Sequence, residues 1–354
     1  MKTIKEIAEA ANVSTGTVDR VIHNRPGVSP KTRERVKAVL DKYNFQKNII
    51  ASTLAFKKEL TIATLIPFSN SSKEFWNEPK RGIIVASNEI QKYGVDTKHY
   101  YFNQFSPESF IESFNKILDL NPNAVLISPI FYKTTIKLIK ELETKNIPYI
   151  FINTDIALQQ NISFIGQNSY QSGFLSGKIL SQVLSEEKTI LIVRSRKNID
   201  SHQAIDSRIK GFIDYNQLHT PSRNIKHLTI ESFATNEIKR KLTNEFLCNN
   251  LIKGIFVPSS YAYKIANVLC NLNLKSIKLL GYDVHKLNID YLNHEIIDFL
   301  IEQEPFEQGY KGVKILFEYL LFKKKPNRTY NSPINIIVKE NIEFVENHSE
   351  NVLN

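Results

Sequence analysis

Residues 3–23 read TIKEIAEAANVSTGTVDRVIH, and this stretch decides the architecture of the amino end. Apolar residues recur at intervals of three and four, which predicts two short helices that each bury one stripe. Thr3 and Glu6 fit a capping box at the start of the first helix. A tight turn follows, and Ser14 can cap the second helix. The stretch therefore predicts two short helices that cross closely.

The exposed side of the second helix is polar and basic. Thr15, Gly16, Thr17 and Arg20 lie on that side, and such a surface suits the major groove of DNA. An ordinary helical hairpin explains the apolar stripe but not this Thr/Arg face. We interpret the pair as a DNA-binding helix-turn-helix.

A third helix is predicted after a short loop. Residues 23–36 read HNRPGVSPKTRERV, in which Ser29 can act as the cap and Pro30 takes the first helical position. The patterns T-I-x-x-I-A-x-x-A-x-V-S-x-x-T-V-x-R-V and V-S-x-x-T-R-x-R-V both lie within residues 3–54. This region resembles the headpiece of the LacI/GalR family of bacterial transcription regulators.

The resemblance implies which residues face DNA. Thr15, Gly16 and Arg20 match the base-reading positions, and Arg20 is able to contact guanine through two hydrogen bonds. Asp19 replaces the family's usual serine near a phosphate, which disfavours binding unless Arg20 or Lys5 offsets its charge. The implied DNA-facing residues are Thr3, Thr15, Gly16, Thr17, Arg20, Asn24, Ser29, Thr32, Ala51 and Leu54.

Residues 47–59 connect the headpiece, residues 1–46, to the rest of the chain. In the resembled family this segment is a hinge helix that folds on operator DNA and wedges a leucine into the minor groove. Ala51 and Leu54 match that helix, whereas Lys47 stands where the family usually has a proline. A passive linker is the alternative.

The composition is that of a soluble globular protein with two or three domains. The chain has 354 residues, of which 42% are hydrophobic and 23% charged. No apolar run reaches eighteen residues and no signal-peptide core precedes the helical pattern, so we expect a cytoplasmic protein with no membrane partner. Cys248 and Cys270 fit neither a disulfide framework nor a metal site, and we expect them to be buried.

The net charge of +10 is spread unevenly. Residues 1–60 contain 12 Lys/Arg and 6 Asp/Glu, so this segment carries +6 and the remainder +4. An excess of positive charge is what a phosphate-facing domain needs. Ordinary solubility charge is the alternative explanation.

Strand-like and helical patterns alternate after residue 60. Strands are predicted at 61–67, 95–102, 124–128, 149–152, 189–194, 254–257 and 278–282, and helices at 79–92, 107–119, 133–145, 169–184, 203–217, 235–248, 260–272 and 306–322. Such alternation predicts parallel sheets with helices on both faces.

This body resembles the type I periplasmic-binding-protein fold, the regulatory half of the same family. The resemblance implies three crossings between two lobes, near 167–169, 301–305 and 324–334, with a ligand in the crevice between them. The resemblance implies an effector-binding domain at residues 60–345. Its first lobe consists of about 60–167 and 303–325, and its second lobe of about 168–302 and 326–345. The expected fold class is a small all-α headpiece followed by an α/β two-lobe domain with parallel sheets.

Candidate effector ligands in the first lobe follow strand ends. Phe75 and Trp76 match the aromatic pair that stacks on sugar rings in related binding proteins, and Asn70 lies nearby to satisfy hydroxyls. Core packing is the alternative for the two aromatic residues. Asn153 and Thr154 stand where the family often has Asp-Arg, which indicates a different ligand, and the following Asp155 fits a ligand acceptor or a turn residue equally.

Candidate effector ligands in the second lobe include one arginine and one aspartate. Arg208 matches the family's R-x-x-G-F and is expected to point its donors into the crevice, although Asp206 could pair with it instead. Asp283 matches a family ligand acceptor at a strand end, with helix capping as the alternative. Ser259 and Glu307 are weaker candidates by the same alignment.

Sequence signals of enzymes and metal sites fail on inspection. Residues 173–178, GFLSGK, lack the spacing and the Ser/Thr of a phosphate-binding loop, and the eight histidines are scattered singly. We expect no catalytic residue, no metal and no cofactor. A sugar-binding protein and an enzyme on the same two-lobe fold are the alternative functions.

The residues and the resemblance together indicate a sequence-specific transcription regulator. We expect a repressor that binds a pseudo-palindromic duplex operator as a homodimer and responds to a small sugar-like effector. Activator instead of repressor, inducer instead of co-repressor, and tetramer instead of dimer remain open from the sequence.

Overall fold

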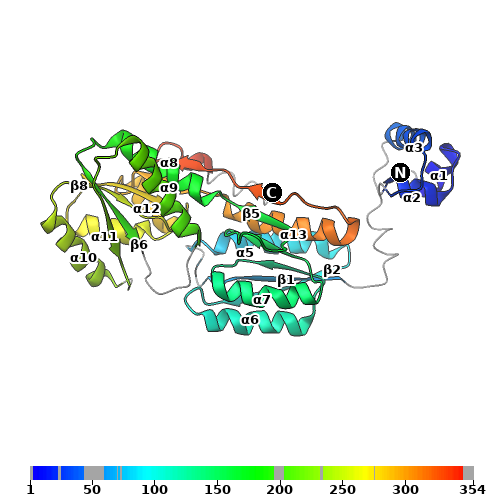
Figure 1. Cartoon of the computed structure of the whole chain (residues 1–354), viewed down its shortest axis with the longest axis horizontal. Helices are drawn as coiled ribbons and strands as arrows, with labels where there is room; N and C mark the ends of the chain where they lie inside the picture. Colours follow the sequence, from blue (N-terminus) through cyan, green and yellow to red (C-terminus); the bar gives the residue numbers. More distant parts are fainter. Residues whose placement is uncertain are drawn as a thin grey trace.

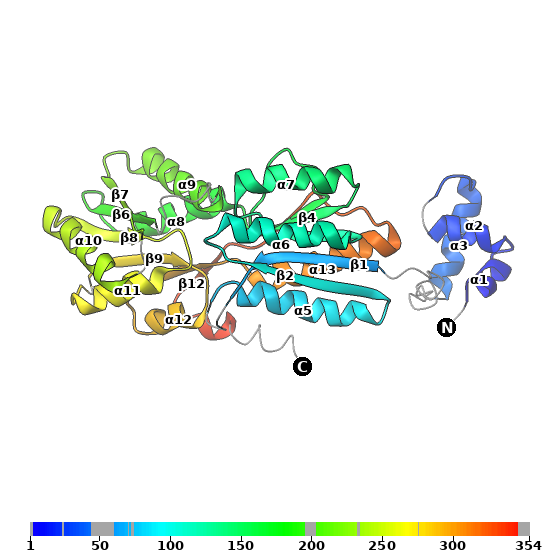
Figure 2. The same ribbon diagram turned by 90° about the horizontal axis from the view of Figure 1, so that it is seen from below.

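The structure of the chain is a computed structural model. It describes residues 3–22, 25–43, 60–69, 71, 74–194, 203–231, 234–274 and 276–345. Figures 1 and 2 show a three-helix unit formed by the amino end and a larger body of two α/β lobes. Four residues assigned above to DNA or effector, Asn24, Ala51, Leu54 and Asn70, lie outside the described residues.

The three helices at the amino end have a small core of their own. They are α1 (Ile4–Ala10), α2 (Thr15–Ile22) and α3 (Pro30–Lys42), which confirms the three predicted helices. Ile7, Val18 and Val36 are fully buried where the helices meet. The apolar stripes predicted from the three- and four-residue spacing therefore face one another.

Side-chain caps begin these helices, as the sequence predicts. Thr3 and Glu6 form the complete capping box of α1. Ser14 Oγ accepts a hydrogen bond of 3.2 Å from the third backbone N–H of α2. Ser29 caps α3, and Pro30 follows it at the first helical position. Each cap satisfies a backbone donor that has no partner inside its helix.

The body contains two six-stranded sheets. The strands of the first sheet are β1 (Leu60–Pro67), β2 (Val95–Phe102), β3 (Ala124–Ile127), β4 (Tyr149–Ile152), β5 (Ser163–Gly166) and β11 (Thr329–Asn331). Those of the second are β6 (Thr189–Arg194), β7 (Ile225–Thr229), β8 (Ile252–Phe256), β9 (Lys278–Tyr282), β10 (Phe299–Glu302) and β12 (Asn335–Ile337). The strand orders are β11-β5-β4-β3-β1-β2 and β12-β10-β9-β8-β6-β7. Among the described strands, every pair is parallel except β10 with β12.

Helices cover both faces of each sheet. The first sheet packs with α5 (Asn77–Gln91), α6 (Pro107–Leu120), α7 (Tyr132–Thr144) and α13 (Pro305–Phe322), and the second with α8 (Ser169–Val183), α9 (Gln203–His219), α10 (Thr235–Cys248), α11 (Ala262–Asn271) and α12 (Lys286–Asn293). Figure 1 shows α6 and α7 on one face of the first sheet and α5 and α13 on the other. In the second lobe, α8 and α9 contribute to one apolar cluster and α10, α11 and α12 to another. The predicted parallel α/β architecture is confirmed.

The chain passes between the two sheets at three places. These are the short segments after β5, after β10 and after β11. The first two agree with the predicted crossings near 167–169 and 301–305. The predicted start of the second lobe's last segment at about 326 is too early. Strand β11, at 329–331, still pairs with β5 in the first sheet, so the third crossing begins after residue 331.

Five strands and one helix were not predicted from the sequence. They are β5, β7, β10, β11, β12 and α12. Four of these strands have only three or four residues, which is too few to display a period. Strand β7 is the edge of its sheet and has one buried position. Its residues therefore lack the apolar run that marks a buried strand.

The two cysteines correct another expectation. Cys248 and Cys270 are exposed free thiols rather than buried hydrophobes. They lie in the last turns of α10 and α11. In the described part of the chain, no helix is long and apolar enough to span a membrane.

Candidate DNA-binding surface and effector cleft

The exposed face of α2 carries the residues predicted to read DNA. Thr15, Gly16 and Arg20 are all exposed, and Val18 and Val21 on the opposite side are buried. This division follows from the helical period, since the apolar positions place the remaining side chains outward. The face is therefore available to a groove, with one guanidinium and one hydroxyl side chain.

Other predicted DNA-facing residues also act as helix caps or cap partners. The Thr3 and Ser29 hydroxyls accept from backbone N–H groups at the starts of α1 and α3. Thr17 lies with its hydroxyl 3.0 Å from that of Ser14, and Thr32 lies with its hydroxyl 2.8 Å from that of Ser29. These four residues surround the starts of the helices rather than the exposed face of α2.

The charge of Asp19 is offset by Arg25, which precedes α3. The sequence pointed to Arg20 or Lys5, but the structure places Arg25 Nη1 at 3.2 Å from the Asp19 carboxylate. Arg33 Nη2 in turn donates to the Arg25 carbonyl at 2.7 Å. Both partners are largely exposed, so the pair adds little stability but reduces local repulsion of phosphate.

In the body, the structure brings Arg208 and Asp283 together through a third residue. Gln303 Nε2 donates to Asp283 Oδ1 at 2.6 Å, and Gln303 Oε1 accepts from Arg208 Nη2 at 3.4 Å. All three side chains are buried, with exposed fractions of 5%, 5% and 1% for Arg208, Asp283 and Gln303. The residues come from α9, the end of β9 and the crossing after β10. We call this trio the polar cluster.

The polar cluster extends into the other lobe through Asn153. Its amide donates to Gln303 Oε1 at 3.3 Å from the end of β4 in the first sheet. Asn153 and Asp283 both have positive φ, 67° and 72°, at the carboxyl ends of their strands. Left-handed backbone at non-glycine positions is found preferentially at functional sites, where the surrounding structure holds it. The cluster therefore connects the two lobes.

Close packing of two helices sets the position of Arg208. A side chain at Gly173 of α8 would meet the Arg208 carbonyl at 1.9 Å, so only glycine allows the two helices to approach this closely. The guanidinium then lies 4.0 Å from the ring centroid of Tyr282 and donates to the Pro258 carbonyl at 3.0 Å. Its Nε is buried without a hydrogen-bond partner among the described residues. Gly173 and Gly177 therefore serve helix packing. This agrees with the sequence of residues 173–178, which lacks the spacing of a phosphate-binding loop.

Burial dominates the electrostatics of Asp283. It raises the pKa of this carboxyl, while the charge of Arg208 and the hydrogen bond from Gln303 act in the opposite direction. The alternative pairing of Arg208 with Asp206 is wrong, because Asp206 pairs with Arg194. Arg208 and Asp283 therefore share one buried environment.

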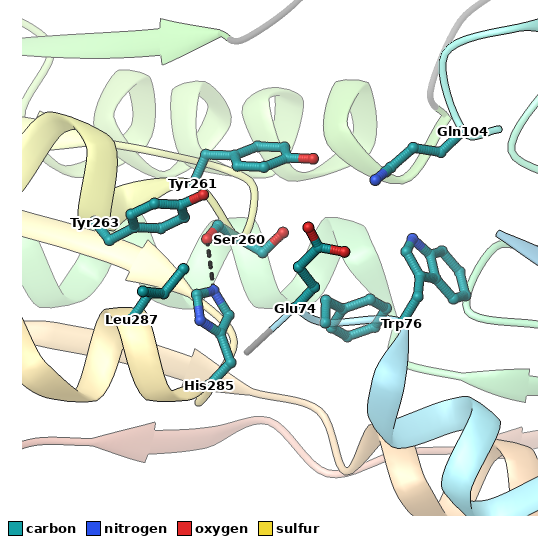
Figure 3. Close-up of a pocket in the computed structure, with 9 residues that line it drawn as sticks. Glu74, Trp76, Gln104, Ser260, Tyr261, Tyr263, His285 and Leu287 are labelled. Atoms are coloured by element: carbon teal, nitrogen blue, oxygen red, sulfur yellow. Dashed lines mark hydrogen bonds between the residues drawn. The ribbon is translucent and has the colours of Figure 1, made fainter. Parts of the chain in front are cut away.

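Phe75 and Trp76 line a hollow beside the polar cluster. Their rings meet edge to face at 4.9 Å between centroids, and both side chains are less than a tenth exposed. The hollow encloses about 20 Å³ of free space, room for about one water molecule, and receives residues from both lobes (Figure 3). Its lining is Glu74, Phe75, Trp76, Gln104, Ser260, Tyr261, Tyr263, His285 and Leu287. We call it the aromatic hollow.

Several residues of the cleft were missed by sequence reasoning. Gln303 is one amide in a crossing segment, and neither period nor motif marks it. Glu74 directly precedes the aromatic pair, and His285 follows Asp283 by two positions. Their position next to predicted ligands could have identified Glu74 and His285. No feature of the sequence marked Tyr261 or Gln104 as site residues.

A second hollow, of about 290 Å³, lies near the first crossing. Its lining includes Asn153, Asp155 and Gln167. Asp155 Oδ1 accepts from the backbone N–H of Ile156 at 3.0 Å, so it has a turn role and also borders the hollow. Both readings of Asp155 fit this arrangement.

Two weaker candidates differ in their placement. Ser259 Oγ is buried and has no hydrogen-bond partner in the ranges that the structure describes. Glu307 lies apart from the polar cluster, because its carboxylate pairs with Lys311 at 3.3 Å and borders a hollow beside residues 329–333. Among the described residues, no three His, Cys, Asp or Glu side chains gather as a metal site would require.

Two family models match this chain. The model described as bacterial regulatory proteins, lacI family, matches residues 3–48, and that described as periplasmic binding protein domain matches residues 62–324. These ranges contain α1 to α3 and most of the two-lobe body.

Characterised relatives match over most of their lengths. The chain is 26% identical over 270 residues to the HTH-type transcriptional regulator MalR of Staphylococcus xylosus, covering 72% of this chain and 77% of that protein. It is 22% identical to the ribose operon repressor of Lactococcus lactis subsp. lactis, covering 97% of this chain and 98% of that protein. A solved LacI-type transcriptional regulator from Bacteroides fragilis is 28% identical with a TM-score of 0.77, covering 81% of this chain and 99% of that one. GanP, a glucose-galactose binding protein from Geobacillus stearothermophilus, shares the fold at 22% identity and a TM-score of 0.69, covering 80% and 99% of the two chains.

Proposed function

Because the chain belongs to the LacI family of bacterial regulatory proteins and carries a periplasmic binding protein domain, we propose that a sugar bound between its lobes controls its affinity for an operator. The observation that carries this proposal is the polar cluster, which joins both lobes through Gln303. A ligand that replaces these contacts changes how the lobes are held relative to each other.

The DNA-binding half of the proposal rests on α2. Its exposed Thr15 and Arg20 are the base readers, and the charge of +6 in residues 1–60 supplies attraction to phosphates. The remaining contacts follow the family resemblance. The proposed DNA-facing set is Thr3, Thr15, Gly16, Thr17, Arg20, Asn24, Ser29, Thr32, Ala51 and Leu54.

The effector half of the proposal rests on the chemistry of the cleft. Sugars offer hydroxyl groups, which are donors and acceptors, and apolar C–H faces, so they bind where carboxylate, amide and guanidinium groups adjoin aromatic rings. The polar cluster and the aromatic hollow supply this combination. The proposed effector-facing set is Asn70, Phe75, Trp76, Asn153, Asp155, Arg208, Ser259 and Asp283, with Gln303 added. Glu307 is left out, because it faces another hollow.

Transmission requires a division of the chain into parts. We take residues 1–46 as the headpiece, 47–59 as the hinge and 60–345 as the effector domain, acting in a homodimer whose two headpieces bind a palindromic site. A change in the lobes alters whether the paired hinges can dock on DNA. A coupling of about 1–3 kcal/mol between effector and operator is typical of such switches. Such a regulator acts in the cytoplasm, as a non-enzymatic protein without a cofactor.

Selection from a random duplex library tests the function directly. The full chain should enrich a pseudo-palindromic sequence, and one sugar of a panel should change its affinity for that sequence about fivefold or more. Duplexes bound without sequence preference, with and without every sugar, would contradict the proposal. Sedimentation of the protein on the selected duplex should give two chains per site.

A further inference from the structure

Six cationic side chains gather at one end of the first lobe. In this lobe the chain passes from a helix into a strand through residues 92–94, 121–123, 145–148 and 323–328. The strands that follow these segments are parallel neighbours in one sheet, so all of these segments lie at the same end of it. They contain no acidic residue, and their basic residues are Lys92, Lys145, Lys323, Lys324, Lys325 and Arg328. We call this end of the lobe the basic pole.

The positive charge of the body is concentrated at the basic pole. Residues 61–354 carry a net charge of +4, so the body without these six residues carries −2. The corresponding helix-to-strand segments of the second lobe contain three basic and four acidic residues. They are 184–188, 220–224, 249–251, 272–277 and 294–298. Both sets follow the carboxyl ends of helices, where the helix dipole favours a cation. Because only one set is basic, the helix dipole does not explain the excess.

The cations of the basic pole face the solvent. All six residues are exposed. Lys324 Nζ pairs with the Glu318 carboxylate at 2.6 Å, and Arg328 Nη1 donates to the Asn161 carbonyl at 2.7 Å. Lys145, Lys323 and Lys325 form no ion pair with any residue that the structure describes. These three lysines are therefore open to an anionic partner.

The headpiece is joined to the body at the basic pole. Strand β1 begins there with Leu60, and Figures 1 and 2 show the last turn of α13 at the same end of the lobe. Sixteen residues separate Tyr43 from Leu60, and a chain of that length spans at most about 55 Å. A duplex held by the headpiece is therefore tethered to this end of the body. Such a duplex presents one negative charge about every 1.7 Å along its axis.

We propose that the basic pole binds phosphates of the duplex held by the headpieces, as a second DNA contact that does not depend on base sequence. This inference rests on the proposed function. Because the pole belongs to the effector domain, that domain itself contributes to operator affinity. Phosphate contacts of this kind strengthen binding to every duplex, whereas Arg20 distinguishes among duplexes.

The salt dependence of DNA binding by the full chain tests the proposal. A triple variant carries Lys145→Gln, Lys323→Gln and Lys325→Gln. Each lost phosphate contact reduces the slope of log affinity against log salt concentration by about 0.9. The slope should become less steep by at least about 2, and affinity at low salt should fall at least about tenfold, for the selected operator and for random duplex alike. Arginine at the same three positions should retain the parent slope, because it keeps the charge.

The matched control carries Lys178→Gln, Lys239→Gln and Lys286→Gln, which remove the same charge from exposed positions of the second lobe. Its slope should remain that of the parent protein. Equal slopes in the two glutamine triples overturn the basic pole as a DNA contact, and so does an arginine triple that loses as much slope as the glutamine triple. If the parent protein prefers no sequence, the proposed function itself fails. That result is distinguishable, because the slopes of the variants can still be compared on random duplex.

Discussion

Arg20 concentrates the sequence preference proposed for the headpiece in one side chain. It is exposed on α2 beside Gly16, which has no side chain to read a base. An arginine that makes two hydrogen bonds to guanine discriminates by about 1–3 kcal/mol. Neighbouring Asp19 is occupied with Arg25, which leaves Arg20 available for this role.

Arg20→Ala should therefore lower affinity for the selected operator by roughly tenfold to a hundredfold. Affinity for random duplex and for sugar should change far less. Gel-shift titrations with both duplexes give the comparison. Arg240→Ala, which removes an exposed arginine from α10 in the body, is the control. Parallel loss of operator and sugar binding in Arg20→Ala would count against separate modules.

Asp283 is the acceptor on which the polar cluster converges. It is buried, accepts from Gln303 and lies beside Arg208. Asp283→Ala should weaken sugar binding by roughly tenfold to a hundredfold, since a hydrogen bond to a charged group contributes about 1.5–3 kcal/mol. Operator affinity without sugar should persist. The effect is measured as the sugar concentration that produces half of the maximal change in operator binding. Asp119→Ala, at an exposed position of α6, is the control. An unaltered sugar titration would remove Asp283 from the proposed site.

Individual site residues were predicted from sequence only where a motif marked them. Arg208 was found through R-x-x-G-F and Asp283 through its strand end. Gln303 could not be found, because its role arises from contacts with residues 20, 95 and 150 positions away. A single amide carries no signal until the chain is folded.

At the scale of elements, the crossing of α8 and α9 fixes the geometry of the cleft. Gly173 faces the Arg208 carbonyl, and Gly211 faces the Tyr170 carbonyl from the other helix. The small residues allow backbone contact, which holds Arg208 against Tyr282. Helix positions were predictable from their 3.6-residue period. Among the strands of three or four residues, β3 and β4 were predicted as continuous apolar runs, whereas β5, β10, β11 and β12 were not.

Gly173→Ala should force these two helices apart, because its Cβ would lie 1.9 Å from a carbonyl oxygen. We expect the free energy of unfolding to fall by about 1–3 kcal/mol, and sugar affinity to fall with it. Urea denaturation and sugar titration measure the two effects. Gly16→Ala is the matched control, since the nearest atom to its added Cβ is 3.8 Å away. A body as stable in Gly173→Ala as in the parent protein would show that the crossing tolerates separation.

At the scale of the whole molecule, the three crossings between the lobes are tied to one another. Gln167 at the first crossing donates to the carbonyls of Glu302 and Pro333 at the second and third. The Glu302 carboxylate accepts from the Asn335 amide at 2.9 Å and from the backbone N–H of Glu304. No motif pointed to this arrangement, because the three segments are brought together only by the two-sheet topology.

Glu302 makes the stability of this region depend on pH. Burial, with smaller contributions from the charges of Glu304 and Asp283, raises its pKa to about 7. The native state then binds this proton more tightly than the unfolded chain does. The resulting stabilisation is complete below the usual Glu pKa of about 4.5 and is lost as pH rises through about 7.

Glu302→Gln should remove this dependence. Relative to the variant, the parent protein should lose roughly 2–3 kcal/mol of unfolding free energy between pH 5 and pH 8. Urea denaturation across that interval gives the difference, and exposed Glu112→Gln on α6 is the control. Identical pH profiles for the parent and Glu302→Gln would mean that the carboxyl titrates with an ordinary pKa.

The last strands of the chain lie at the edges of both sheets, β11 beside β5 and β12 beside β10. Neither lobe can acquire its full set of strands during synthesis until residues 329–337 have left the ribosome. The helix-turn-helix, by contrast, is complete after about forty residues. A nonsense mutation shortly before residue 329 would thus yield a fragment that retains the DNA reader and lacks an intact sensor, an allele insensitive to its sugar.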